Sequence, residues 1–243
     1  MKHMLALGLI LASLLALLAA LPGLANPDFS CADVTEIPSI ECEALVALYN
    51  STNGPGWISN TNWLVTNTPS DWFGVTVDSG HVTELQLLDN NLLGSLPTEL
   101  GNLSSLTVIM ASYNYLSGEI PPELGDLSSL TTLDLPYNRL SGAIPAELGN
   151  LSKLWFLSLA CNSFSGSVPP ELGNLSKLEV LYLFADGLSG AIPPELGNLS
   201  SLRILYLYQN YLSGNIPAEL GNLSNLEEMD LSYNRYLSGH IPT

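Results

Sequence analysis

The chain has 243 residues, of which 23 are acidic and only 6 are basic, so its formal net charge is −17 at pH 7. A surface this acidic repels phosphate backbones and anionic lipid head groups, which excludes nucleic acid and peripheral membrane surfaces as partners. The three histidines, His3, His81 and His240, lie too far apart in the sequence to form a metal-ligand motif. The sequence therefore predicts no metal and no cofactor.

The N-terminus has the features of a cleaved signal peptide. Lys2 and His3 form a short polar start, residues 4–20 are an apolar run, and residues 22–25 supply a helix break and a small residue. A transmembrane anchor is the alternative, because the run is nearly long enough to cross a bilayer. No stop-transfer flank follows. We therefore expect residues 1–25 to be removed, and the mature chain to be secreted to the extracellular space or cell surface without membrane insertion.

Residues 26–80 are expected to form an N-terminal cap. Residues 39–50 have the apolar spacing of a short amphipathic helix. The polar stretch that follows is punctuated by Trp57, Trp63 and Trp72. We expect the helix and these tryptophans to cover the first turn of the structure that follows, since an uncovered repeat end would expose apolar edges.

The three cysteines are unevenly placed. Cys31 and Cys42 flank a short segment in the oxidising compartment that secretion implies, and we predict a disulfide between them. Cys161 is then left over. We interpret it as a small apolar filler, with an intermolecular disulfide as the alternative.

From Leu100 onward the chain repeats every 24 residues, in a phrase close to L-G-N-L-S-x-L-x-x-L-x-L-x-x-N-x-L-S-G-x-I-P-x-E. A fixed period of this length with this leucine pattern predicts a solenoid. The L-x-L segment alternates as a short strand does, so stacked turns predict a concave parallel β-sheet in a right-handed α/β repeat coil. We expect about seven turns over residues 81–243, with no C-terminal cap.

A polar residue recurs once in every turn. The seven positions are Asn90, Asn114, Asn138, Asn162, Asp186, Asn210 and Asn234. A tight turn leaves main-chain N–H and C=O groups that need partners, and an inward amide can both donate and accept. We therefore expect a hydrogen-bonded ladder along the coil. Asp186 is the exception, because an ionised carboxylate cannot donate, so this position should be under-satisfied or protonated.

The repeat phrase resembles the plant-type leucine-rich repeat family, which includes receptor-kinase ectodomains and secreted polygalacturonase inhibitors, over about residues 40–243. Residues 71–78, D-W-F-G-V-T-V-D, are similar to the family's cap motif C-x-W-x-G-V-x-C, with Ser70 and Val77 standing where its two cysteines would be. The resemblance implies binding of proteins, peptides or carbohydrates on the curved surface, with no chemistry of its own.

The period also marks the residues that face outward from the predicted sheet. In turns four to six these positions bring together six aromatic side chains: Trp155, Phe156, Tyr182, Phe184, Tyr206 and Tyr208. Rings exposed together form a docking surface for a protein partner or stack against sugar rings. The alternative is that Tyr and Phe favour strands and pair across neighbouring turns.

Two carboxylates, Glu228 and Asp230, lie two residues apart on one predicted strand and face the same side, as a general acid–base pair would. No nucleophile motif accompanies them, so a solvated terminal turn is the favoured interpretation and a hydrolase is the third class of function. The leading hypothesis is a secreted, non-enzymatic module that binds a protein or peptide. The alternative is carbohydrate or cell-wall binding, including inhibition of a wall-degrading enzyme.

Overall fold

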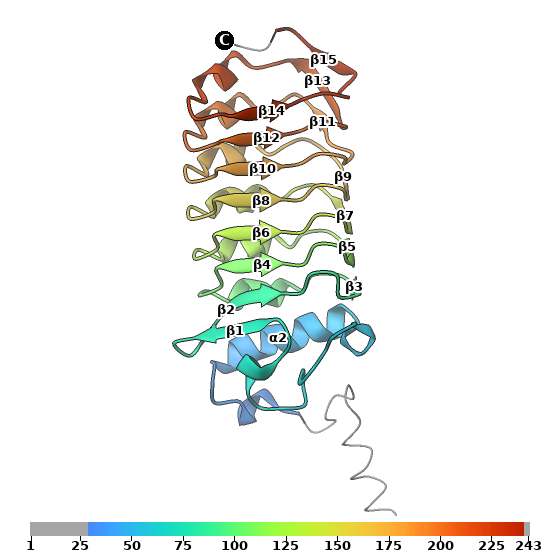
Figure 1. Ribbon diagram of the computed structural model, residues 1–243, viewed down its shortest axis with the longest axis vertical. Coiled ribbons are helices and arrows are strands. Elements are labelled where there is room, and N and C mark those ends of the chain that lie inside the picture. Colours follow the sequence, from blue (N-terminus) through green and yellow to red (C-terminus); the bar gives the residue numbers. More distant parts are fainter. Residues whose placement is uncertain (1–28, 241–243) are drawn as a thin grey trace, which may run out of the picture.

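The computed structural model of the protein describes residues 29–240 (Figure 1). The expected signal peptide over residues 1–25 lies outside the described residues, as do His3 and residues 241–243. Within the described part, short elements repeat along one long axis, and the sequence runs in order from a helical cap at one end to the last turn at the other (Figure 1).

The main sheet has eight strands and runs the length of the coil. Its order is β1 (Val75–Asp78), β2 (His81–Gln86), β4 (Val108–Met110), β6 (Thr132–Asp134), β8 (Phe156–Ser158), β10 (Val180–Tyr182), β12 (Ile204–Tyr206) and β14 (Glu228–Asp230). From β2 onward neighbouring strands are parallel and pair with an offset of one repeat, so that Tyr182 lies opposite Tyr206. The predicted parallel sheet and repeat solenoid are confirmed. The antiparallel strand β1 was not predicted.

The repeated leucines fill the interior. In turn three, for example, Leu133 and Leu135 flank the outward Asp134 and are completely buried. The same alternation recurs in each parallel strand because successive side chains of a strand point to opposite faces. The stacked leucines therefore form one continuous core along the axis.

A second row of short strands lies on the side of the coil that follows the main sheet in each turn. It comprises β3 (Leu93–Gly94), β5 (Tyr115–Gly118), β7 (Arg139–Gly142) and β9 (Ser163–Phe164), and then β11 (Ser189–Gly190), β13 (Tyr211–Asn215) and β15 (Tyr236–Ser238). The glycine of the repeated S-G pair has a left-handed backbone, as at Gly166 with φ of 80°. Side chains other than hydrogen disfavour that region, which explains the recurrence of glycine.

Each turn returns through a five-residue 3₁₀ helix that follows a proline. These helices are η4 (Thr98–Asn102), η5 (Pro122–Asp126), η6 (Ala146–Asn150), η7 (Pro170–Asn174), η8 (Pro194–Asn198) and η9 (Ala218–Asn222). From η4 to η8, each of these helices contains a glycine at a point where the next turn approaches it closely. A Cβ atom at Gly149 would lie 2.4 Å from the carbonyl oxygen of Glu171 in the next turn.

The cap is built on α2 (Ser39–Ser51), which extends the predicted helix by one residue and packs against η4. Tyr49 on its buried face stacks on Trp63, with ring centroids 5.7 Å apart. Trp57 and Trp72 are also buried, and each indole N–H donates to a main-chain carbonyl, which satisfies the one polar atom of the side chain. The short helices η2 (Gly54–Gly56) and η3 (Pro69–Asp71) complete this layer.

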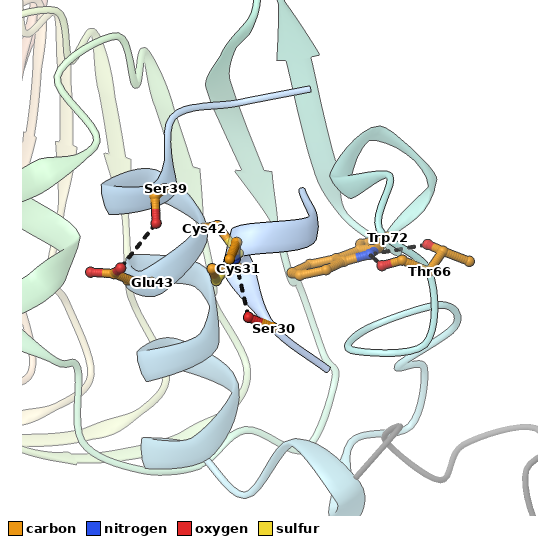
Figure 2. Close-up of a disulfide and its surroundings, with 8 residues drawn as sticks. Ser30, Cys31, Ser39, Cys42, Glu43, Thr66 and Trp72 are labelled. Carbon is orange, nitrogen blue, oxygen red and sulfur yellow. Dashed lines mark hydrogen bonds between the residues drawn. A yellow bond between two sulfur atoms is a disulfide. The ribbon is translucent and has the colours of Figure 1, made fainter. Parts of the chain in front are cut away.

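A disulfide ties the start of the described chain to the cap helix, as the sequence predicted. It joins Cys31, in η1 (Cys31–Asp33), to Cys42 on the buried face of α2 (Figure 2). Ser70 and Val77, which stand where the family's cap motif has two cysteines, lie elsewhere in the cap. The cap therefore has one covalent link within its first segment.

A buried carboxylate, which sequence reasoning missed, links α2 to the first turn. Glu41 is only 2% exposed and accepts from the main-chain N–H of Val82 at 2.8 Å. Its other oxygen lies 2.6 Å from Nδ1 of His81. Both groups belong to the start of β2, so Glu41 satisfies the strand at the point where the cap meets the coil.

Candidate binding surface

The strand face is the outward side of the main sheet, and turns four to six of it carry the aromatic patch predicted from the sequence. The patch comprises Trp155, Phe156, Tyr182, Phe184, Tyr206 and Tyr208. The rings form one connected group in which every member contacts at least one other, with centroid separations of 4.5–6.3 Å. The parallel register of β8, β10 and β12 places them in adjacent turns.

Two pairs within the patch stack face to face between turns five and six. The rings of Tyr182 and Tyr206 are 5.1 Å apart at 18°, and those of Phe184 and Tyr208 are 4.5 Å apart at 9°. Phe156 meets Tyr182 edge-on, at 83°. Stacking covers one face of each of these four rings and leaves their edges, the tyrosine hydroxyls and the outer faces at the ends of the stacks uncovered by the partner ring. Trp155, at one end, is 44% exposed.

Not every position that the period places on the strand face is exposed. Ser112, Thr132, Ser158 and Ala160 are buried. These side chains are short, and larger neighbours in adjacent turns exclude water from them. The accessible surface is therefore set by the rings in turns four to six, and elsewhere by the apolar side chains of Leu88 and Met110 and by longer polar side chains.

Polar side chains in the first three turns bond within the protein. Thr107 and Thr131 each donate to a main-chain carbonyl of the preceding turn at 2.9 Å. Ser112 donates to the carboxylate of Asp134 at 2.9 Å. Burial raises the pKa of Asp134, and hydrogen bonds from Ser112 and Ser158 oppose that shift. This half of the strand face has few polar groups left to bind a partner.

Charged side chains border the C-terminal end of the patch. The guanidinium of Arg203 makes two hydrogen bonds to Glu227, at 2.9 and 3.0 Å, and lies 3.8 Å from Glu179. The hydroxyl of Tyr206 donates to Glu228, and this bond raises the pKa of Tyr206 to about 12. Tyr206 is therefore a neutral donor at physiological pH.

The acid pair predicted on the last strand is present on β14. Glu228 bonds to Tyr206, and Oδ1 of Asp230 accepts from the main-chain N–H of Ser232 at 2.8 Å. Over residues 29–240, no group of three or more His, Cys, Asp or Glu residues is placed to hold a metal ion. In the same range no helix has both the length and the apolar character to cross a membrane.

The asparagine ladder runs beneath the strand face. In turn three, Nδ2 of Asn138 donates to the carbonyls of Ala111 in the preceding turn and Leu135 in its own turn, at 2.9 and 3.1 Å. Its Oδ1 accepts from the N–H of Leu116 at 3.0 Å. The equivalent bonds recur at Asn114, Asn162, Asn210 and Asn234. Asn90 bonds instead to the main chain of Ser59 in the cap. The amides thus bond to main-chain groups of two successive turns rather than to each other.

Asp186 interrupts the ladder in turn five, under the aromatic patch. Its Oδ1 accepts from the N–H of Asn162 at 2.9 Å, whereas its Oδ2 is buried without a hydrogen-bond partner. An amide here would donate to the carbonyls of Leu159 and Leu183, as the other rungs do. Burial raises the pKa of Asp186 to about 7, and hydrogen bonds from the main chain of Asn162 and Phe164 oppose that shift.

A second aromatic feature, which the sequence analysis did not single out, flanks the strand face. Tyr113 and Tyr137 are exposed and stack with centroids 4.4 Å apart at 9°. Each directly precedes a ladder asparagine, so the 24-residue spacing itself could have identified the pair. Cys161 occupies the next equivalent position and is a half-buried free cysteine, and burial raises the pKa of its thiol.

Comparisons with known proteins agree with this architecture. The Arabidopsis receptor kinase HAESA, solved with the peptide hormone IDA and the co-receptor SERK1, is 34% identical over 84% of this chain and 34% of that chain, with a TM-score of 0.70. PEPR1 in the PEPR1–AtPEP1 structure is 33% identical over 83% of this chain and 29% of that chain, with a TM-score of 0.73. This chain therefore spans about a third of these receptor chains.

A plant ice-binding protein is more similar in length. It is 26% identical over 82% of this chain and 72% of that chain, with a TM-score of 0.69. A family profile described as a leucine-rich repeat region matches residues 98–240, more than half of the sequence. The chain belongs to the leucine-rich repeat family, in its plant type.

Proposed function

We propose that this protein is a secreted, non-catalytic binding module whose aromatic patch docks a protein or peptide partner. The observation that carries the proposal is the contrast within the strand face. Its first three turns bond their polar groups internally, whereas turns four to six present a connected set of six rings. Aromatic side chains of this kind supply much of the binding energy in protein interfaces.

Ring orientation favours a peptide over a sugar. Carbohydrate rings pack on the faces of aromatic side chains, but Tyr182, Tyr206, Phe184 and Tyr208 each have one face covered by a stacked partner, which leaves open faces only at the ends of the stacks. The edges and hydroxyls that remain suit the amide groups and mixed side chains of a peptide, since ring edges carry partial positive charge. The similar HAESA structure, which contains a peptide hormone, supports the same class of ligand.

A random linear peptide library panned against the mature chain tests the proposal. Tyr182→Ala with Tyr206→Ala should weaken selected peptides by about a hundredfold or more, as loss of central aromatic contacts does in other interfaces. The matched control is Met110→Ala with Asp134→Ala, at the same register positions of turns two and three, and it should leave affinity unchanged. Because Tyr182 and Tyr206 stack on each other, melting temperatures are measured for both double variants.

Equal affinities for the two double variants would contradict the proposed surface. Selection of glycans rather than peptides on a parallel glycan array would favour the carbohydrate alternative. Turnover of a polysaccharide that disappears in Glu228→Gln would contradict the non-catalytic assignment.

Secretion and the division into a signal peptide (1–25), a cap (26–80) and a solenoid (81–243) belong to the same proposal. The Cys31–Cys42 disulfide supports it, because such bonds persist in oxidising compartments. N-terminal sequencing of the protein recovered from the medium of its native host should start at Asn26. Recovery only from the cytosolic fraction, with residues 1–25 intact, would contradict it.

A further inference from the structure

The aromatic stack ends openly on the side of turn seven. Tyr206 and Tyr208 stack on Tyr182 and Phe184 through the ring faces that point toward turn five. Strand β12 lies between β10 and β14, so the opposite ring faces point toward turn seven. The residue paired with Tyr206 there is Asp230, and no ring of turn seven continues either stack.

Space and charge at this open end suit a cation. The residue of turn seven level with Tyr208 is Ser232, which is short and exposed. Two carboxylates of turn seven lie at this end: Glu228 accepts from the hydroxyl of Tyr206, and Asp230 is paired with Tyr206 in the sheet. The guanidinium of Arg203 is held by Glu227 and Glu179. Within residues 29–240, neither Glu228 nor Asp230 has a salt-bridge partner.

The carboxylate of Asp230 also lies close enough to influence the rings. Burial is the main cause of the raised pKa of Tyr208, and smaller electrostatic contributions from Cys161 and Asp230 add to it. The same carboxylate adds to the raised pKa of Tyr206, after its bond to Glu228 and burial. Asp230 uses Oδ1 for the N–H of Ser232, which leaves acceptor capacity on the carboxylate for a ligand.

We propose that the open end of the stack, formed by Tyr206, Tyr208 and Asp230, binds the guanidinium group of an arginine in the peptide partner. The planes of Tyr206 and Tyr208 are inclined by 62°, so the planar guanidinium lies on the outer face of Tyr208, over the short Ser232, and Tyr206 borders it. There it extends the stack of Phe184 and Tyr208 and gains a cation–π interaction. Its N–H groups then reach the carboxylate of Asp230 in a charge-assisted bond. Lysine retains the charge but not the planar fork, so arginine is preferred. This inference rests on the proposed function, because the arginine arrives on the docked peptide.

The random peptide library described above tests the inference when panned on the wild-type chain and counter-selected on Tyr182→Ala with Tyr206→Ala. Peptides that depend on the patch should be enriched in arginine. Replacing the enriched arginine by citrulline, its uncharged analogue, should weaken binding by about tenfold or more, and replacing it by lysine should weaken binding less.

Variants of the protein separate this site from general attraction to an acidic surface. Asp230→Asn keeps the acceptor for Ser232 and should weaken arginine-containing peptides by about tenfold. Asp134→Asn removes the same charge at the same register position of turn three and should change affinity by less than about twofold. Equal effects of the two substitutions would mean general electrostatic attraction and would overturn the site.

The outcomes also separate the inference from the proposed function. Patch-dependent peptides without arginine enrichment, or with an aromatic residue in its place, would overturn the cation site and leave the docking surface standing. A library that yields no patch-dependent peptide would contradict both.

Discussion

The two halves of the strand face have the same backbone but use it differently. In turns one to three, Thr107 and Thr131 bond to the main chain, and Ser112 bonds to Asp134. In turns five and six, the positions equivalent to Asp134 are Tyr182 and Tyr206 and those equivalent to Ser112 are Phe184 and Tyr208, and these rings stack across the turns. The named polar side chains of turns one to three therefore bond within the protein, whereas the rings of turns five and six keep edges and hydroxyls for a partner. The buried leucines recur in both halves and impose neither arrangement, so the residues at the outward positions of the strands decide the function.

The ladder beneath the two halves differs as well. Rungs at Asn114 and Asn138 donate to two carbonyls each, whereas Asp186, beneath the aromatic patch, leaves Oδ2 without a partner. The half of the strand face that we propose for binding therefore rests on the weaker rung.

The largest expected effect comes from repairing that rung. The pKa of Asp186 in the folded protein, about 7, lies above the ordinary aspartate value of 3.8 because the carboxyl is buried. The folded state therefore binds the proton of Asp186 more tightly than the unfolded chain does. The protonated carboxyl adds most to the free energy of unfolding below pH 4, and this stabilisation is lost as the pH rises toward 7. A shift of this size corresponds to roughly 4 kcal/mol. Asp186→Asn restores the donor and should raise the free energy of unfolding by about 2–4 kcal/mol at pH 7.5.

Denaturant titrations of the wild type and of Asp186→Asn between pH 4 and 8 measure the free energy of unfolding. The difference between the two proteins at each pH isolates Asp186 from the other titrating groups. Asn138→Asp, in the first half of the coil, is the control and should introduce a comparable loss at pH 7.5. A variant no more stable than the wild type at pH 7.5, or a difference that does not grow with pH, would contradict the account of the rung.

A smaller effect is expected from the cap, at the far end of the coil from the aromatic patch. Opening the Cys31–Cys42 disulfide, which closes a separation of 11 residues, should lower stability by about 2–3 kcal/mol. Peptide affinity at the aromatic patch should stay the same at temperatures where the protein is folded. Calorimetry on Cys31→Ala with Cys42→Ala measures the first quantity, and peptide titration measures the second. Loss of binding in the folded variant would mean that the two ends are coupled.

The smallest effect concerns the stacking itself. A double-mutant cycle of Phe184→Ala and Tyr208→Ala should give a coupling energy of about 1 kcal/mol. The matched cycle, Leu88→Ala and Ser112→Ala at the same register positions of turns one and two, should be additive. Thermal or denaturant unfolding of the wild type and the six variants provides both values. Coupling of equal size in the two cycles would remove the distinction between the halves.

Most of the fold could be predicted from the repeat, because the same pattern of apolar leucines recurs in seven turns. Strand positions, the interior leucines, the ladder positions and the cap helix all follow from spacing alone. The strand β1 was missed although its four residues alternate between apolar and polar, because its pairing with β2 depends on a tight turn at Ser79 and Gly80. The second row of strands was missed for a similar reason: Ser and Gly carry little strand propensity, and main-chain bonds between turns hold them.

The candidate site was only partly predictable. Spacing brought the six aromatic residues of the patch together, but it could not give the ring orientations, which decide whether faces or edges meet a ligand. Burial of Ser158 and Ala160 likewise depends on the size of neighbouring side chains in other turns. Glu41 was missed because a carboxylate on an amphipathic helix normally lies in solvent, and its partners are about 40 residues away in the sequence.

Hydrogen–deuterium exchange of the protein with and without a selected peptide tests the central claim most directly. The account predicts slower exchange over residues 155–158, 180–184 and 204–208 when the peptide is bound, with no change over the equivalent segments 84–88, 108–112 and 132–136. Protection confined to those first three turns, or to the 3₁₀ helices on the opposite side of the coil, would contradict it.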